Sequence, residues 1–256
     1  MLEAHSIFWH YLWVAPNALL LILAFLLWCR GLNQKYPIFF IFAIGGALAQ
    51  LVIYAADIIP AVTPEIWWRI FWLGLLVEGL LKFALIGEVF AHAFDAYTSV
   101  SKLGKFLIRA VGVVLILTAA VAAAFAPRDS RFGIVSGAHL LEQTIYLIES
   151  GLLVFIFSFS SYFNVRLKRP VLGIALGLSV SACVHLAILA VVANGGLPDQ
   201  TRQHLDFLNM GAYHVCVLMW FSYLLVPEKA VAESAVPLPE NNLAVWNREL
   251  ERLLQQ

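Results

Sequence analysis

Long hydrophobic runs alternate with short polar stretches along the chain as far as residue 226. Seven of the runs are long enough to cross the hydrocarbon core of a bilayer, which takes about 20 helical residues. They are Tyr11–Trp28, Tyr36–Ala56, Trp67–Phe94, Lys105–Ala126, Ala138–Asn164, Pro170–Asn194 and Leu205–Val226. The pattern predicts an all-α integral membrane bundle of seven transmembrane helices in a domain that covers residues 1–227.

The pattern changes after Pro227, and residues 228–256 are expected to form a tail. Glu228–Glu240 has the composition of a linker. Leu243–Gln256 has the period of a short amphipathic helix, which suits a helix lying on the membrane or pairing with a partner. The alternative for this segment is a frayed end. A cytoplasmic or membrane signalling partner, if there is one, is expected to bind through Leu243–Gln256.

The distribution of Lys and Arg predicts the orientation of the bundle. The tail and the first, third and fifth loops hold eleven of these residues, and the opposite side holds four. Positive charge accumulates on the cytoplasmic side of membrane proteins. We therefore expect the amino end outside the cytoplasm and the carboxyl end inside.

The composition agrees with a membrane protein. Hydrophobic residues make up 62% of the chain and charged residues 12%, about half the share in a soluble domain. The formal net charge is zero, so there is no electrostatic reason to expect a nucleic-acid partner. The expected partner is the lipid bilayer.

Ionisable residues inside a bilayer are costly, and the default hypothesis for each is a function. Glu78 and Lys82 lie one helical turn apart near the predicted midplane, as a structural ion pair or as functional groups. Glu88, His92 and Asp95 follow on the same helix. These three are either metal ligands or a proton-accepting cluster, or they mark where the helix leaves the membrane.

The fifth run carries a polar stripe in which His139, Glu142, Tyr146 and Glu149 fall within about 80° on a helical wheel. Polar residues on other runs lie in the outer half or near the middle of the predicted bundle. The sequence therefore predicts a polar pocket that opens outward. Its predicted lining is Asn17, Gln50, Tyr54, Asp57, Glu78, Lys82, Glu142, Tyr146, Glu149, His185, Tyr213 and His214.

Retinal, zinc and haem are the cofactor candidates for such a pocket. Microbial rhodopsins hold retinal on a lysine of the seventh helix, and this run has none, so retinal is not expected. Zinc has candidate ligands in His139, His185 and His214, but the chain has no HExxH motif. Haem needs two facing histidines, for which His185 and His214 are the candidates.

The favoured hypothesis is a receptor- or sensor-like protein whose pocket binds a small ligand or a proton, and this hypothesis is favoured over an enzyme. One alternative is an intramembrane enzyme that uses a metal or haem in the same pocket. Another is a structural subunit of a membrane complex.

Three stretches carry a resemblance to a known group of proteins. They are Trp68–Phe90 (WRIFWLGLLVEGLLKFALIGEVF), His139–Leu153 (HLLEQTIYLIESGLL) and Tyr213–Leu225 (YHVCVLMWFSYLL). They resemble a group of uncharacterised bacterial seven-helix membrane proteins, over nearly the whole chain. The resemblance implies a bacterial cytoplasmic (inner) membrane location and no particular activity. Rhodopsins and G-protein-coupled receptors are similar in architecture only, which does not imply function.

Overall fold

The computed structural model describes residues 6–95, 131–162, 167–193 and 198–226, with the single positions 106, 110, 113, 165, 248, 251 and 252. In the second range, side chains are described from Glu142 onward. The described part forms six long α-helices. They are α1 (Ile7–Cys29), α2 (Pro37–Ile58), α3 (Pro64–Ala93), α5 (Arg131–Tyr162), α6 (Arg169–Ala193) and α7 (Asp199–Leu225).

These helices correspond to six of the seven predicted runs, and the chain is all-α in the part described. The remaining run, Lys105–Ala126, falls outside the described ranges except for three single positions, and so does most of the Leu243–Gln256 segment. Two helices begin well before the predicted boundary. α5 begins at Arg131 rather than Ala138, and α7 begins at Asp199 rather than Leu205. The first turns of α7 are polar, so a criterion based on hydrophobicity missed them, and the first turns of α5 contain Arg131 and two glycines, which are poor helix signals.

Several helix ends are set by residues that satisfy free backbone groups. Ser6 Oγ accepts a hydrogen bond from Trp9 N at 3.2 Å at the start of α1. Thr63 Oγ1 accepts one from Ile66 N at 3.4 Å at the start of α3. Such caps replace hydrogen bonds that the first turn of a helix lacks. Gly31 follows α1 with φ 68°, a left-handed conformation that glycine adopts without strain.

The start of α2 is capped from another helix. Pro37 occupies the first turn, and Glu88 of α3 accepts hydrogen bonds from Ile38 N at 3.0 Å and Phe39 N at 2.9 Å. His92 Nδ1 lies 2.9 Å from the Glu88 carbonyl oxygen. Glu88 therefore stabilises the start of α2, because a carboxylate at a helix N-terminus satisfies free N–H groups and opposes the helix dipole. This contact explains the buried glutamate without a metal or a proton-accepting cluster.

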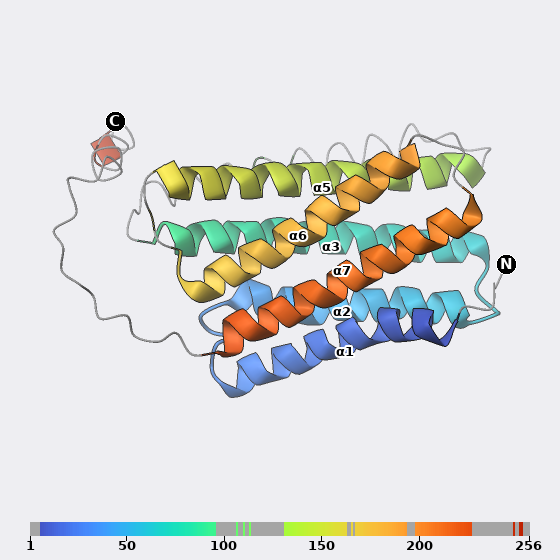
Figure 1. Cartoon of the computed structure of the whole chain (residues 1–256), viewed down its shortest axis with the longest axis horizontal. Coiled ribbons are helices and arrows are strands. Elements are labelled where there is room, and N and C mark those ends of the chain that lie inside the picture. Colours follow the sequence, from blue (N-terminus) through green and yellow to red (C-terminus); the bar gives the residue numbers. More distant parts are fainter. Residues whose placement is uncertain are drawn as a thin grey trace.

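The six helices form a ring in which each contacts the next in chain order, and α7 closes the ring against α1 (Figure 1). α3 also contacts α6 across the ring. α3 and α5 run in the same direction, whereas α5 and α6 are antiparallel (Figure 1). As a result, the starts of α1, α3, α5 and α7 and the ends of α2 and α6 lie at the same end of the bundle.

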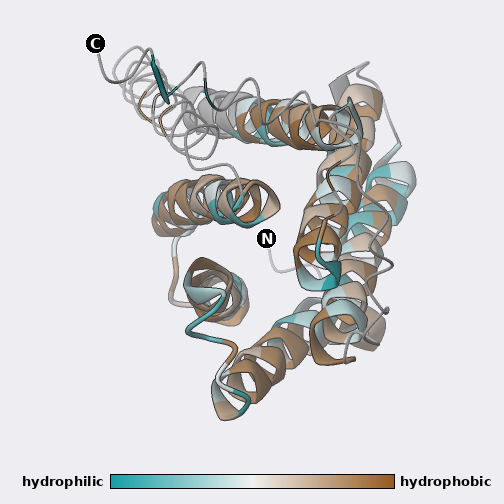
Figure 2. Ribbon diagram, turned by 90° about the vertical axis from the view of Figure 1, so that its left-hand side faces the viewer, coloured by the Kyte–Doolittle hydropathy of each residue, from teal (hydrophilic) through white to brown (hydrophobic). Residues whose placement is uncertain are grey.

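All six helices are long and apolar enough to cross a membrane. Figure 2, a view along the helices, shows that hydrophobic residues cover most of each one. Many large hydrophobic side chains face outward, including Phe25 on α1, Leu73 on α3 and Val154 on α5. A soluble monomer rarely exposes apolar patches of this extent. These features place the bundle in a lipid bilayer.

The end of the bundle away from the amino terminus is filled by hydrophobic side chains. Trp220 of α7 packs edge-on against Phe39 and Phe42 of α2, with ring centroids 5.5 and 5.7 Å apart. Ile86 of α3 and Ile174 of α6 are also fully buried in this core. The opposite end is different, because polar residues and open space lie between its helices.

Candidate functional site

A cavity of about 460 Å³ lies inside the bundle, and all six described helices contribute to its wall. Small-molecule sites in proteins typically measure about 300–1,000 Å³. The lining extends from Asp206, which is exposed on α7, to Trp220, which is buried further along the same helix. Trp9 of α1 and Trp67 of α3 line it near the starts of their helices. The mouth therefore lies at the amino-terminal end of the bundle.

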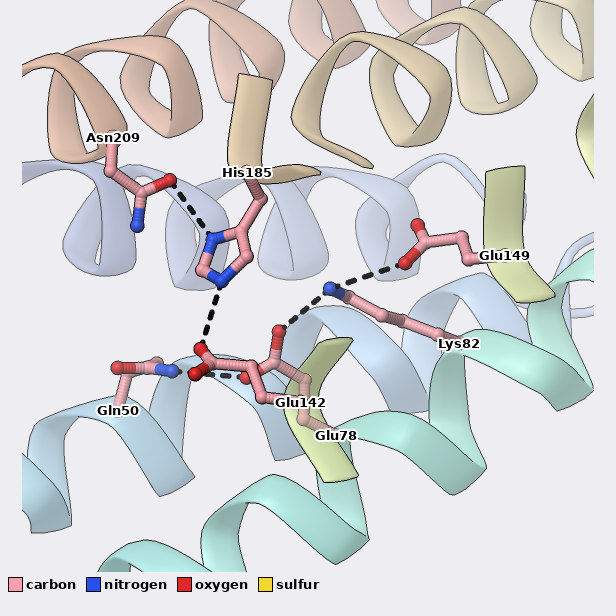
Figure 3. A network of polar contacts seen from close by, with 7 residues as sticks. All are labelled: Gln50, Glu78, Lys82, Glu142, Glu149, His185 and Asn209. Atoms are coloured by element: carbon pink, nitrogen blue, oxygen red, sulfur yellow. Dashed lines mark hydrogen bonds and ion pairs between the residues drawn. The ribbon is translucent and has the colours of Figure 1, made fainter. Parts of the chain in front are cut away.

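Nine of the twelve residues predicted to line the pocket line this cavity. They are Asn17, Gln50, Asp57, Glu78, Lys82, Glu142, Tyr146, His185 and Tyr213. Counted along the helices at 1.5 Å per residue, the interacting polar groups lie about 12–27 Å from the amino-terminal end. They form two connected groups (Figure 3).

The first group crosses from α2 through α3 to α5. Gln50 Nε2 donates to Glu78 Oε2 at 3.0 Å, and Lys82 Nζ lies 3.0 Å from Glu78 Oε1. Lys82 also contacts Glu149 Oε2 at 3.5 Å. Lys82 is 4% exposed and Glu149 is fully buried. One ammonium thus serves two carboxylates, one within its own helix and one across the bundle.

The second group joins α5, α6 and α7. His185 Nε2 lies 2.9 Å from Glu142 Oε1, and His185 Nδ1 lies 3.2 Å from Asn209 Oδ1. Both neighbouring atoms are hydrogen-bond acceptors in this arrangement. His185 therefore links α5 to α7 through its two ring nitrogens, whose donor and acceptor roles depend on the tautomer.

Tyr146 of α5 connects the two groups. Its ring stacks on the His185 ring, with centroids 3.8 Å apart and an interplanar angle of 24°. Lys82 Nζ lies 4.1 Å from the centre of the same ring. Cations are attracted to the face of an aromatic ring, so Tyr146 contacts both Lys82 and the imidazole. A displacement of His185 would therefore reach the Lys82 pair through one side chain.

Two polar atoms of the cavity wall have no hydrogen-bond partner. Asn17 is 2% exposed, and its Nδ2 donates to the Trp13 carbonyl oxygen at 2.7 Å. Its Oδ1 is then an acceptor without a donor. Trp67 Nε1 is a donor without an acceptor. Buried polar groups are nearly always paired, so these two atoms mark positions where a bound molecule or water can supply a partner.

Three of the predicted residues do not line the cavity. Glu149 lies behind Lys82, which it contacts. Tyr54 forms a hydrogen bond of 3.0 Å with His10 Nδ1 and packs among the tryptophans of α1. His214 lies beside the Tyr11 ring, with centroids 6.1 Å apart.

The structure does not bring the candidate haem ligands His185 and His214 together. His185 and His214 do not share the cavity, and both nitrogens of His185 already have partners. The side chain of His139 lies outside the described part. Among the described residues, no group of three or more His, Cys, Asp or Glu is placed to hold a metal ion. The haem pair expected from the sequence, His185 and His214, therefore does not form.

Several lining residues were not among the predicted ones. Asn209 lies one turn before Tyr213 on α7, and Ser181 lies one turn before His185 on α6. Both residues could have been predicted from the sequence, because a spacing of four residues puts them on the same helical face as a predicted lining residue. Trp9 and Trp67 lie near the starts of their helices, and tryptophan is common at such membrane boundaries. Here they also form walls of the cavity.

The chain matches no family model, and the searches of curated proteins and of solved structures give no match either.

Proposed function

We propose that this chain is a receptor- or sensor-like membrane protein whose cavity binds a small ligand from outside the cytoplasm. The observation that carries the proposal is the 460 Å³ cavity with its two polar groups and two unpaired polar atoms. A bundle that needed only stability would fill this space, because close-packed interiors gain dispersion contacts that a cavity loses. A binding site explains both the open space and the polar wall.

The direction of the helices supports a seven-helix topology. α3 and α5 are consecutive among the described helices and run in the same direction (Figure 1). A chain can do this in a membrane only if it crosses back between them, and the predicted run Lys105–Ala126 is long enough for that crossing. An odd number of crossings puts the two chain ends on opposite sides.

The orientation of the cavity follows from the charge distribution. The side that holds eleven Lys and Arg residues is expected to face the cytoplasm. The mouth lies at the opposite, amino-terminal end, so ligands enter from outside. The resemblance to bacterial seven-helix proteins favours a bacterial inner membrane, and Leu243–Gln256 remains the proposed contact for a signalling partner.

A thermal-stability screen of the detergent-purified protein tests ligand binding. Gly46 lines the cavity, and an added Cβ would meet only Phe42 Cε2 at 3.9 Å, so Gly46→Leu should fill space without breaking the wall. Gly151→Leu is the matched control, because Gly151 is exposed on α5 with no atom within 4 Å of an added Cβ. We expect molecules that raise the Tm of the wild type and of Gly151→Leu but not of Gly46→Leu.

The outcome separates this proposal from its alternatives. If no molecule from a chemically diverse library discriminates between the two variants, the cavity is not a ligand site, and a structural subunit becomes the better hypothesis. An absorption spectrum and metal analysis of the same sample address the enzyme alternative. A Soret band or one bound metal per chain would contradict the sensor hypothesis in favour of a cofactor protein.

A further inference from the structure

The cavity wall carries more negative than positive groups. Its carboxylates come from α2, α3, α5 and α7. One more carboxylate, from α5, does not line the cavity but contacts Lys82. They are Asp57, Glu78, Glu142 and Asp206, together with Glu149. Lys82 and His185 are the basic residues among the described ones that line the cavity, and His185 is charged only when protonated. Among the described lining residues, acidic side chains therefore outnumber basic ones.

The contacts make the imbalance more specific. Lys82 is divided between Glu78 and Glu149, at 3.0 and 3.5 Å, so its single charge does not neutralise both. His185 is already engaged by Glu142 at 2.9 Å. No further lysine or arginine lines the cavity in the described part of the chain. Within a low-dielectric bundle, this excess attracts a cation and disfavours an anion.

Asn17 supplies an independent observation. Its amide orientation is fixed, because Nδ2 donates to the Trp13 carbonyl oxygen and only the oxygen remains. That oxygen is buried and has no donor. A ligand that suits Asn17 must offer an N–H or O–H group. A protonated amine offers both the donor and the positive charge, whereas a quaternary ammonium offers only the charge.

The remaining wall is aromatic near the mouth. Trp9, Trp13, Trp67 and Phe71 line the cavity there. Trp67 and Phe71 stack at 5.3 Å with an interplanar angle of 11°. Aromatic faces bind both apolar surface and cations. They suit the apolar body of a ligand whose charged end lies deeper.

We propose that the cavity selects a small protonated amine with an apolar body, its ammonium group directed toward Asn17 and the carboxylates of the wall. The proposal rests on the ligand-binding function proposed above and adds the chemical class of the ligand. A metal ion is a poorer candidate, because the described His, Cys, Asp and Glu side chains form no group of three around one point.

Three probes of similar shape test the charge. They are 4-phenylbutylamine, which is cationic, 4-phenylbutan-1-ol, which is neutral, and 5-phenylpentanoate, which is anionic. Affinity is measured by thermal shift and by isothermal titration calorimetry on the full-length protein in detergent. We expect the amine to bind at least about tenfold more tightly than either of the others, as a charge-assisted hydrogen bond implies. Equal or tighter binding of the alcohol or the carboxylate would overturn the proposal.

Two variants test the contacts. Asn17→Leu removes the unpaired acceptor and should weaken amine binding about tenfold, while Gln143→Leu, an exposed residue of α5 away from the cavity, should not change it. Asp206 is exposed, so the Asp206→Asn variant should fold even if Asn17→Leu does not. It should weaken the binding of the amine several-fold and leave the binding of the alcohol unchanged. If both variants bind the amine as the wild type does, the site assignment is wrong.

The two proposals fail in different ways. If the amine does not bind but the library screen finds neutral or anionic ligands that Gly46→Leu excludes, the amine assignment is wrong and ligand binding stands. If neither the probes nor the library bind in a way that Gly46→Leu abolishes, both proposals are wrong.

Discussion

Lys82 is a buried cation in the described part of the bundle. Its ammonium is buried among two carboxylates and the face of a tyrosine ring. Removing one member of a buried ion pair leaves an uncompensated charge, whereas replacing the whole pair by apolar residues is often tolerated. The stability of the bundle should therefore respond differently to single and to paired substitutions at this position.

Lys82→Met should lower the free energy of unfolding by about 3–5 kcal/mol, because Glu149 is left buried without its cation. In a bundle of this size, that corresponds to a fall in apparent Tm of roughly 10 °C. The double variant Lys82→Met with Glu149→Leu should recover much of the loss. Thermal unfolding of the purified protein, followed by circular dichroism, measures both.

The control for this prediction is Lys168→Met. Lys168 contacts Asp95 at 3.8 Å, and both side chains are largely exposed, so their pair contributes at most about 1 kcal/mol. If Lys82→Met and Lys168→Met have the same Tm, the buried pair does not hold the bundle together.

Glu88 provides a second prediction at this scale. Glu88→Ala leaves the Ile38 and Phe39 N–H groups without their acceptors and should destabilise the protein by about 1–3 kcal/mol. Glu65→Ala is the comparison, since Glu65 lies exposed in the first turn of α3 and its loss should change stability by less than about 0.5 kcal/mol. Chemical denaturation of the two variants side by side decides the matter, and equal midpoints would contradict the capping role.

Glycine controls how closely two of the helices approach. A Cβ at Gly177 of α6 would overlap the Trp220 indole, and a Cβ at Gly173 would overlap Tyr223, both on α7. Trp220 cannot easily move aside, because Phe39 and other core residues enclose it. Small residues at a helix interface let two backbones come close in membranes.

Two glycine substitutions should therefore change stability in opposite directions. Gly177→Ala should destabilise the protein by about 1–3 kcal/mol through overpacking. Gly211→Ala, where no atom lies within 4 Å of the added Cβ, should stabilise it by about 0.5–1 kcal/mol, because alanine favours the helix. Thermal unfolding of the two variants provides the comparison, and a shift of the same sign in both would refute the packing argument.

The sequence predicted the helices better than it predicted their partners. Hydrophobic runs located six helices because bilayer thickness fixes the length of such a run. Helical spacing put Glu78 and Lys82 one turn apart, and the structure pairs them. The contacts of Lys82 with Glu149 and of Glu78 with Gln50 join different helices. Those contacts depend on helix rotation and distance, which periodicity alone does not define.

The same limit explains the residues that were misplaced. Tyr54 shares a helical face with Gln50, yet its hydroxyl forms a hydrogen bond with His10 of α1 instead of lining the cavity. His214 was grouped with His185 because the two lie at similar depth on consecutive helices. The depth of a residue in the membrane can be predicted from the sequence. The direction in which its side chain points around the bundle axis depends on how the neighbouring helices pack.

At the scale of the whole molecule, the topology has a direct test. Green fluorescent protein fused after Gln256 should fluoresce, and alkaline phosphatase at the same position should be inactive, because the carboxyl end is expected in the cytoplasm. Phosphatase fused after Ala61, between α2 and α3, should be active. The reverse pattern would place the cavity mouth in the cytoplasm.

The bundle is densely filled at one end and hollow at the other, and this difference has a mechanical consequence. Where Trp220 interlocks with its neighbours, the helices resist relative movement. Where the cavity separates them, the helices are joined by individual hydrogen bonds and ion pairs rather than by continuous packing, and regions with few buried apolar contacts deform most easily. We therefore expect the helices to tilt about the filled end, with the largest displacements at the mouth. A molecule that draws the mouth closed would change helix angles rather than helix contacts.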